Sequence, residues 1–502
     1  MVATTTGRVR GLLIDGVQTF KAVPYGASTA GARRFLPPLS AAPWAGVRDA
    51  FSFGPRAPQL LAPFVPEWQP LTGTEPMSED CLHLNVWTPS TATGGRRPVM
   101  VWLHGGGYTG GSPAALPYDG THLAGRHDVV VVSITHRLNV LGFIYLTDIA
   151  GERFAGASNA GQKDIIAGLE WVRDNIDRFG GDPKNVTIFG QSGGAGKVST
   201  LLGMPAAQGL FHRAIAQSGS AVASMPAGTA TQHAEALMSR LGLKPAQADA
   251  LQKLPVDQVL AAMRAPGGGR GGFATSPVVD GMSLPRDVFS PTATPLSASI
   301  PLLIGSTETE VTWSVNTDYT VPADVEALRQ RVARTLRIDQ ARAQTLVDVY
   351  QSGRPHSSLL DLVLIMETDG SQFRTGVDLE AERKSAAVQA PVYMYRFQWY
   401  SPVSGGRLRA MHCMDIPFAF DNVDNSQPIV GGGPDRQALA DRMSRAWVAF
   451  ARSGDPNHAG LPHWTPFTGS VRATMMLNSD CRLVDDPYRR ERLATAAATT
   501  DR

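Results

Sequence analysis

Short, continuous apolar runs, each bounded by turn-forming residues, are the feature that most constrains the fold of this chain. They lie at residues 98–103 (PVMVWL), 129–134, 186–189, 214–216, 301–304 and 392–397. Uninterrupted runs of this length are typical of parallel strands covered on both faces, whereas strands with one solvated face alternate in polarity. The pattern therefore predicts an α/β fold with a mostly parallel central sheet flanked by helices.

The segment between the second and third runs predicts a covering helix. Its apolar residues recur at helical spacing; they are Ile165, Leu169, Val172 and Ile176. Gly180 follows them as a typical helix stop. Glycine-rich stretches at 266–272 and 431–433 are predicted loops. No break in composition divides the 502 residues. We expect one domain over 1–502 with large loop and helical insertions, and a frayed C-terminal tail at 487–502.

Composition excludes several classes of protein. The chain is 43% hydrophobic and 18% charged, with a formal net charge of +2, which is typical of a globular protein and offers no basic stripe for nucleic acid. No apolar run approaches the roughly 18 residues of a membrane span, and the N-terminal segment lacks a signal-peptide core. We expect a cytoplasmic protein, a monomer or weak homodimer, although a secreted mature form stays open.

Cysteine usage predicts neither disulfides nor a metal centre. Cys81, Cys413 and Cys481 are too few and too far apart for a disulfide framework or for paired metal ligands. We expect reduced thiols, no metal and no cofactor.

The stretch 186–196, VTIFGQSGGAG, contains the motif G-x-S-x-G. In a chain of this composition the bare motif should occur by chance roughly 0.3 times, so its context must support it. An apolar strand precedes the first glycine, and residues 194–203 form a plausible helix. This strand–turn–helix context predicts that Ser192 lies on a strained turn with an exposed, nucleophilic hydroxyl.

Two phosphate-binding alternatives fit less well. The pair at 196–197 suggests a P-loop, but Gln191 stands where that loop needs glycine and Val198 where it needs Ser or Thr. Residues 105–110 match G-x-G-x-x-G after a strand, yet a dinucleotide site must open a helix there. The residues that follow, 112–120 (SPAALPYDG), contain two prolines that oppose a helix.

The two glycine-rich loops together predict acyl transfer. Negative charge develops on the substrate's carbonyl oxygen in that reaction, so backbone N–H donors must already point at it. Glycine lets the backbone approach closely because it has no Cβ. We therefore expect the loop 104–107 (HGGG) to form an oxyanion hole, with N–H donors from Gly106, Gly107 and Gly193.

Blocks across nearly the whole chain resemble the type B carboxylesterases, α/β-hydrolases that include cholinesterases and bacterial p-nitrobenzyl esterases. The blocks occur in the family's order; they are FKAVPYG with RRFLPP, SEDCLHLNVWTP, VWLHGGGYTGGS, FGGDPKNVTIFGQSGGA, AIAQSGS, IGSTETE and HCMDIPFAF. The resemblance implies that Ser192 is the nucleophile, Glu310 the triad acid and His412 the base. Glu308 is the rival acid, and spacing from Gly305 favours Glu310.

The chemistry of these three roles is well defined. A serine hydroxyl becomes a good nucleophile when an imidazole takes its proton, and histidine titrates in the range that suits this exchange. The carboxylate holds the imidazole's tautomer and stabilises the imidazolium. The resemblance further implies that Ser218 hydrogen-bonds near the triad, and a plain strand-end serine is nearly as good an interpretation. It also implies buried ion pairs, Arg34–Glu79 and Arg137–Asp164.

Departures from the family pattern bear on specificity. Gln191 replaces the usual glutamate, which removes a negative charge beside the nucleophile and weakens the case for a cationic choline substrate. Gly193 replaces the usual alanine, which we expect to make the turn more flexible or to admit a bulkier acyl group. Val311 replaces the glycine that commonly follows the triad acid. Cys81 lacks the partner cysteine of the family's first disulfide.

The expected substrate contacts are Tyr108, Gln191, Trp313 and Phe418, although aromatic residues near a large sheet are more often core than pocket. A neutral, partly aromatic site suggests uncharged esters of small to medium size, aromatic esters among them. We predict a serine carboxylic-ester hydrolase of EC class 3.1.1. The alternatives are an acyltransferase or a carbamate or amide hydrolase with the same triad, and a non-catalytic binding protein of the same fold.

Overall fold

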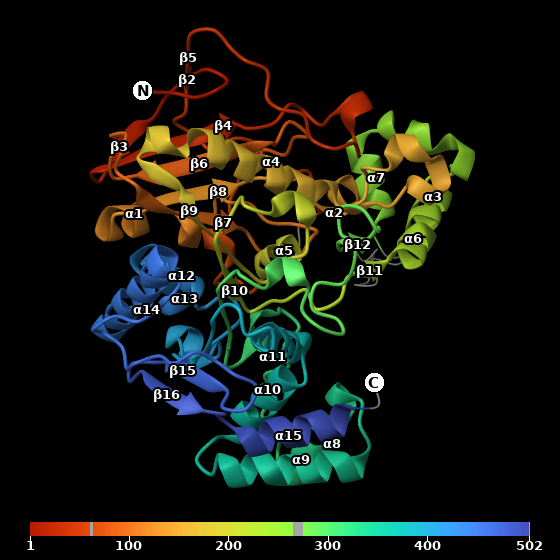
Figure 1. The fold of residues 1–502 in the computed structure, drawn as a ribbon. Coiled ribbons are helices and arrows are strands. Elements are labelled where there is room, and N and C mark those ends of the chain that lie inside the picture. The colour runs from red at the N-terminus through yellow and green to blue at the C-terminus, as the bar shows by residue number, and fades with distance from the viewer. Residues whose placement is uncertain (61–63, 265–274, 501–502) are drawn as a thin grey trace.

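A central twisted sheet organises the computed structural model, which describes residues 1–60, 64–264 and 275–500. Within these residues one sheet has 11 strands (Figure 1). Their spatial order is β16 (Arg482–Asp485), β15 (Ala473–Leu477), β14 (Val392–Phe397), β13 (Leu302–Thr307), β10 (Arg213–Gln217), β9 (Gly181–Gln191), β7 (Arg97–Leu103), β8 (Val130–Ile134), β6 (His83–Thr88), β4 (Val17–Pro24) and β3 (Leu12–Ile14). Two small sheets join β1 (Val2–Ala3), β2 (Arg8–Arg10) and β5 (Val47–Asp49), and β11 (Met225–Pro226) with β12 (Val278–Val279).

The centre of the sheet is parallel, and its two edges are antiparallel. All neighbouring pairs from β15 to β8 run parallel, whereas β16 pairs antiparallel with β15, and β6, β4 and β3 continue antiparallel from β8. The predicted α/β fold is confirmed, and each of the six apolar runs forms or overlaps one of the parallel strands.

Fifteen α-helices surround the sheet within the described ranges. They are α1 (Thr121–His127), α2 (Asn139–Phe143), α3 (Thr147–Ala150), α4 (Ala160–Asn175), α5 (Gly193–Leu201), α6 (Ala227–Arg240), α7 (Val256–Ala262), α8 (Val325–Leu336), α9 (Gln340–Gly353), α10 (Leu359–Asp369), α11 (Gln372–Ser385), α12 (Ile416–Ala419), α13 (Gln427–Val430), α14 (Pro434–Ser453) and α15 (Arg489–Thr499). The helix predicted around Ile165 is α4, which ends at Asn175. Ile176 begins a short 3-10 helix, Ile176–Phe179, which Gly180 ends in the left-handed conformation.

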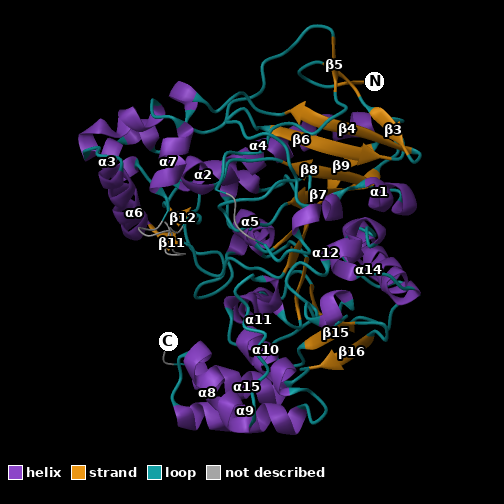
Figure 2. Cartoon of the chain, turned by 180° about the vertical axis from the view of Figure 1, so that it is seen from behind, coloured by secondary structure: helices purple, strands orange, loops and turns teal. Residues whose placement is uncertain are grey.

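Each face of the sheet has its own apolar core because side chains along a strand alternate in direction. On β7, Val99, Val101 and Leu103 face a core shared with α4, α5 and α11, whereas Met100 and Trp102 face one shared with α1, α12 and α14. Figure 2 shows this layered arrangement from behind. None of the helices in the described ranges has both the length and the apolar character needed to cross a membrane.

The C-terminal segment departs from prediction. Residues 489–499 are not frayed but form α15, which packs with α8, α9 and α10 in a helical cluster at one end of the molecule (Figure 1). Ala498 is buried there, and Thr495 hydrogen-bonds the hydroxyl of Tyr350 at 2.8 Å. The short side chains of this helix carry no strong apolar stripe, so its docking surface is invisible to periodicity.

The two glycine-rich loops have different outcomes. Residues 431–433 connect α13 to α14 as a loop, as predicted. The predicted loop at 266–272 lies outside the described residues.

Candidate active site

Ser192 lies at the sharp turn between β9 and α5. Its backbone is strained, with φ 57° and ψ −123°, and its N–H donates to the Gln217 carbonyl at 2.8 Å. Flanking glycines make the turn possible: a Cβ on Gly194 would lie 2.0 Å from the Leu103 carbonyl oxygen, and one on Gly190 would lie 2.6 Å from the Gly194 carbonyl carbon. The turn leaves Ser192 partly exposed.

Glu310 and His412 meet from two different loops at the same edge of the sheet. Glu310 follows β13, His412 lies in the loop after β14, and His412 Nδ1 contacts Glu310 Oε2 in a short hydrogen bond. Glu310 Oε1 also accepts the Thr307 N–H at 2.7 Å. Burial raises the pKa of Glu310, but the imidazole and other neighbours outweigh it, so the pKa lies below the usual value. An ionised Glu310 can hold the His412 tautomer in which Nδ1 carries the proton and Nε2 is free to accept one.

Glu308, the rival acid, has different partners. Its carboxylate pairs with Arg354 at 2.7 Å and accepts from Gln398 Nε2 at 2.9 Å. Burial raises the pKa of Glu308, but Arg354 and other arginines lower it further, so the net pKa is depressed. Glu308 therefore belongs to a buried ion-pair network rather than to the imidazole.

Gln191 contacts the imidazole nitrogen that must accept the serine proton. Its Nε2 lies 3.1 Å from His412 Nε2, while its Oε1 accepts from Cys413 Sγ at 3.3 Å. Among the described residues, no hydrogen bond joins the Ser192 hydroxyl to His412 in this conformation. The Gln191 amide therefore lies against the imidazole nitrogen that takes the serine proton in a triad of this kind.

The loop 104–107 has the geometry of an oxyanion hole. Gly106 and Gly107 have φ of 93° and 62°, which favour glycine. Within the described part of the chain, the N–H groups of Gly106, Gly107 and Gly193 make no hydrogen bond to another protein group. Three unpaired donors beside Ser192 can stabilise charge that develops on a substrate oxygen.

The space beside Gly193 is not open to a bulkier acyl group, contrary to one of the two expectations for this glycine. A Cβ at this position would lie 2.1 Å from the Gly107 carbonyl oxygen and 2.4 Å from its Cα and carbonyl carbon. The oxyanion loop itself therefore fills the space of the missing methyl group. Glycine at 193 brings the loop closer to the nucleophile.

The expected aromatic contacts fall into two groups. The partly exposed Trp313 has its ring centroid 5.8 Å from that of His412, and the ring of Tyr108 packs edge-on against Phe143 at 5.1 Å. Phe418, by contrast, is fully buried and packs against Phe397 in the core beneath α12 and α14. The prediction of a substrate contact for Phe418 is wrong, because its ring is fully buried in that core.

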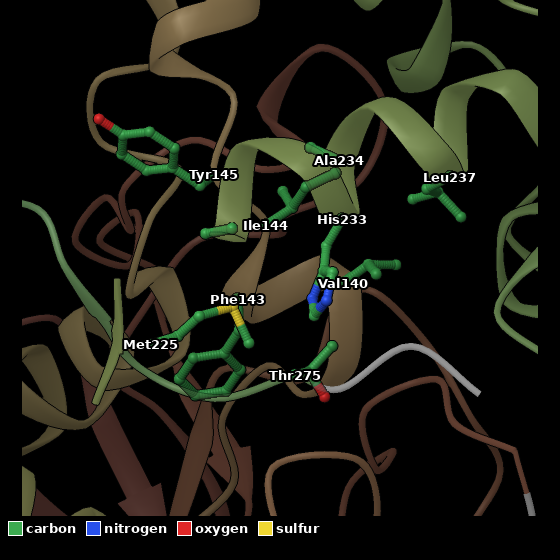
Figure 3. Close-up of a pocket in the computed structure, with 10 residues that line it drawn as sticks. Val140, Phe143, Ile144, Tyr145, Met225, His233, Ala234, Leu237 and Thr275 are labelled. Atoms are coloured by element: carbon green, nitrogen blue, oxygen red, sulfur yellow. The ribbon is translucent and has the colours of Figure 1, made fainter. Parts of the chain in front are cut away.

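Sequence reasoning missed two aromatic residues. Phe373, on α11, lies 4.4 Å from the His412 ring, and no motif marks it. Phe143 packs against Tyr108 and also lines a small apolar cavity of about 20 Å³ (Figure 3), which holds little more than one water molecule. The cavity is lined by Val140, Phe143, Ile144, Tyr145, Met225, Ala230, His233, Ala234, Leu237 and Thr275.

Three further features expected from the resemblance are a serine near the triad and two buried ion pairs. Ser218 is fully buried beside Glu310, where it contributes to the low pKa of that carboxyl, and its N–H donates to the Gly305 carbonyl at 2.8 Å. Both expected ion pairs form: Arg34 with Glu79 at 2.7 Å, and Arg137 with Asp164 at 2.6 Å. In the described part of the chain, no three His, Cys, Asp or Glu side chains converge as metal ligands.

Comparisons with known proteins agree with this geometry. Residues 1–496 match the model of the Carboxylesterase family. A para-nitrobenzyl esterase of Bacillus subtilis (strain 168) is 32% identical over 509 residues, covering 98% of this chain and 97% of that protein. A phenmedipham hydrolase of Pseudarthrobacter oxydans is 35% identical over 491 residues, covering 95% and 94%.

Solved structures are similar over the same length. A Geobacillus stearothermophilus carboxylesterase superimposes with a TM-score of 0.83 at 37% identity, covering 98% of this chain and 99% of that one. An esterase from Clostridium hathewayi, whose description says it can hydrolyze aliphatic aromatic polyesters, gives a TM-score of 0.85 at 33% identity, covering 99% and 98%. The chain therefore belongs to the carboxylesterase family, with the α/β-hydrolase fold and the ester-hydrolase activity of EC class 3.1.1.

Proposed function

We propose that Ser192, His412 and Glu310 hydrolyse uncharged small to medium carboxylic esters, aromatic esters among them, through an acyl-enzyme. The observation that carries this proposal is the contact of His412 with the buried Glu310 beside the strained Ser192 turn, facing the unpaired N–H groups of the oxyanion loop.

In the proposed reaction, Ser192 Oγ attacks the ester carbonyl while His412 Nε2 takes its proton. The carbonyl oxygen becomes an oxyanion that accepts from the N–H groups of Gly106, Gly107 and Gly193. Collapse of the tetrahedral intermediate breaks the bond to the alcohol, which leaves with the proton from His412. Water then attacks the acyl-enzyme in the same way and releases the acid and free Ser192.

The surroundings of the triad support a neutral substrate. Gln191 contributes no charge beside the nucleophile, and Trp313 and Phe373 offer apolar surface next to His412. Relatives with names that refer to para-nitrobenzyl esters and to aliphatic aromatic polyesters support aromatic esters as substrates. Carbamate hydrolysis is a second candidate because a 35% identical relative is a phenmedipham hydrolase.

We further propose a monomer or weak homodimer that works in a reducing compartment. The three cysteines, Cys81, Cys413 and Cys481, are free thiols, which supports that setting.

Labelling with a fluorophosphonate, located by mass spectrometry, tests the proposal together with turnover of p-nitrophenyl and p-nitrobenzyl esters. We expect labelling at Ser192 alone, and a fall in turnover of ~10⁴–10⁶ in S192A with an unchanged melting temperature. S199A is a matched control because Ser199 lies on the same helix but donates to Glu380. Retained turnover in S192A, or labelling elsewhere, would contradict the proposal. Transfer of the acyl group to added alcohol in preference to water would favour the acyltransferase alternative.

A further inference from the structure

Lys197 is a buried cation that the proposed reaction does not use. It lies in the second turn of α5, one turn beyond Ser192, and is fully buried. Its Nζ donates to the His104 carbonyl at 3.0 Å and to the Gly107 carbonyl at 2.9 Å, and lies 5.6 Å from the centre of the Tyr108 ring. These two carbonyls stand at the two ends of the oxyanion loop.

The burial of this side chain is costly, so its contacts need a physical explanation. An amine removed from water favours its neutral form, and burial lowers the pKa of Lys197 to about 7. The contacts do not depend on the charge, because an ammonium has three N–H donors and a neutral amine still has two. Lys197 can therefore hold both carbonyls in either state.

All four carbonyl groups of the loop 104–107 accept hydrogen bonds from other protein groups. The two outer carbonyls, of His104 and Gly107, accept from Lys197. The two inner ones accept from other groups: the Gly105 carbonyl from His104 Nδ1 at 2.9 Å, and the Gly106 carbonyl from the Gly110 N–H at 3.1 Å. In a trans peptide, the carbonyl of one residue points opposite to the N–H of the next. The N–H groups of Gly106 and Gly107 share peptides with the two inner carbonyls, so His104 and Gly110 set the direction of these donors. Lys197 fixes the flanking peptides at the two ends of the loop and so holds the segment that carries the donors in place.

Gly193 makes the contact with Lys197 possible. The Gly107 carbonyl that Lys197 binds occupies the place where a side chain at position 193 would begin, 2.1 Å from a Cβ built there. Gly193 and Lys197 thus act on the same carbonyl oxygen, one by leaving space for it and the other by binding it.

We propose that Lys197 is a positioning residue that holds the oxyanion loop against α5, so that its N–H groups are already aimed at the oxyanion. This inference rests on the proposed ester hydrolysis at Ser192. Oxyanion donors act on the tetrahedral intermediate more strongly than on the bound ester. Loss of Lys197 should therefore lower kcat in both acylation and deacylation while KM changes little.

The test compares K197M with K384M. Lys384 is also fully buried and donates to a backbone carbonyl, that of Ala298 at 3.1 Å, but it lies on α11 away from the loop. Both variants lose a buried amine, so both report the general cost of that change. For each we would measure the melting temperature, kcat and KM for p-nitrophenyl butyrate, and Ki for an aryl trifluoromethyl ketone, which forms an oxyanion adduct with the nucleophile.

We expect kcat of K197M to fall about 10- to 100-fold, with KM within about threefold and Ki for the ketone raised in proportion to the loss of kcat. All three constants of K384M should stay within about threefold of wild type. If K197M does not fold, K197Q replaces it, because its amide is one bond too short to reach both carbonyls.

Three results would overturn the inference. The first is a kcat of the folded Lys197 variant within threefold of wild type, and the second is a loss of kcat with unchanged Ki. The third is failure of both K197M and K197Q to fold, which would show a structural role alone. A wild-type protein that is inactive and unlabelled at Ser192 would instead remove the proposed function. Labelling and turnover of wild type therefore distinguish the two failures.

Discussion

Replacement of Gly193 by alanine is the change for which sequence resemblance and tertiary structure make different predictions. The resemblance, in which alanine is the usual residue here, leads us to expect that alanine would only stiffen the turn or narrow the acyl site. In this structure the new Cβ would lie 2.1 Å from the Gly107 carbonyl oxygen, whereas ordinary contact begins at 3.4 Å. The two groups must separate by about 1.3 Å, the difference between those distances. Because the obstacle is backbone, the loop itself must move.

The displaced loop carries two of the three oxyanion donors. A misplacement of about 1 Å in a reacting geometry costs roughly 10²-fold in rate. Complete loss of one donor costs ~10²–10³-fold. We therefore expect kcat of G193A to fall about 10²-fold. Overpacking should lower the free energy of unfolding by about 1–3 kcal/mol, which leaves the protein folded.

The assay is turnover of p-nitrophenyl esters per active site titrated with a fluorophosphonate, with urea denaturation for stability. G228A is the matched control, because Gly228 lies in α6 and a Cβ there would meet no atom within 4 Å. It should keep wild-type kcat. Wild-type kcat in G193A would refute the reasoning. So would additive losses in the G193A/K197M double variant, since both changes act on one carbonyl and should overlap.

Three further predictions concern charge. Burial raises the pKa of Glu380 to about 8, so the unfolded chain binds fewer protons than the folded one from about pH 4.5 to 8, and stability falls as pH rises through that window. Urea denaturation at pH 5 and pH 9 should show a larger fall in the free energy of unfolding for wild type than for E380Q. Equal falls in the two proteins would contradict the prediction. D164N should cost about 3–5 kcal/mol in urea denaturation, because it leaves the buried Arg137 without its partner; an unchanged midpoint would argue against it. Q191E places a carboxylate beside the nucleophile and should raise kcat/KM for a choline ester about 10-fold relative to its neutral isostere, worth about 1.4 kcal/mol. An equal effect on both esters would contradict an electrostatic cause.

Local sequence patterns were sufficient to predict the parallel strands of the central sheet and the turn that carries Ser192. The continuous apolar runs predicted the parallel strands because burial on both faces leaves no room for polar alternation. The G-x-S-x-G motif predicted the turn at Ser192 because only glycine tolerates backbone this close at positions 190 and 194. Both signals lie within a few residues of the structure they specify.

The tertiary structure decided which distant groups meet. The Gln191 amide faces His412, 221 residues away, and Lys197 reaches carbonyls about 90 residues before it. The Gly107 carbonyl fills the space beside Gly193, and Phe418 turns into the core. Such contacts depend on how loops pack across the sheet edge, and no periodicity or spacing along one segment records the surface of another. The sequence alone therefore determined the fold and the chemistry of the candidate residues, and packing decided how the oxyanion loop is held.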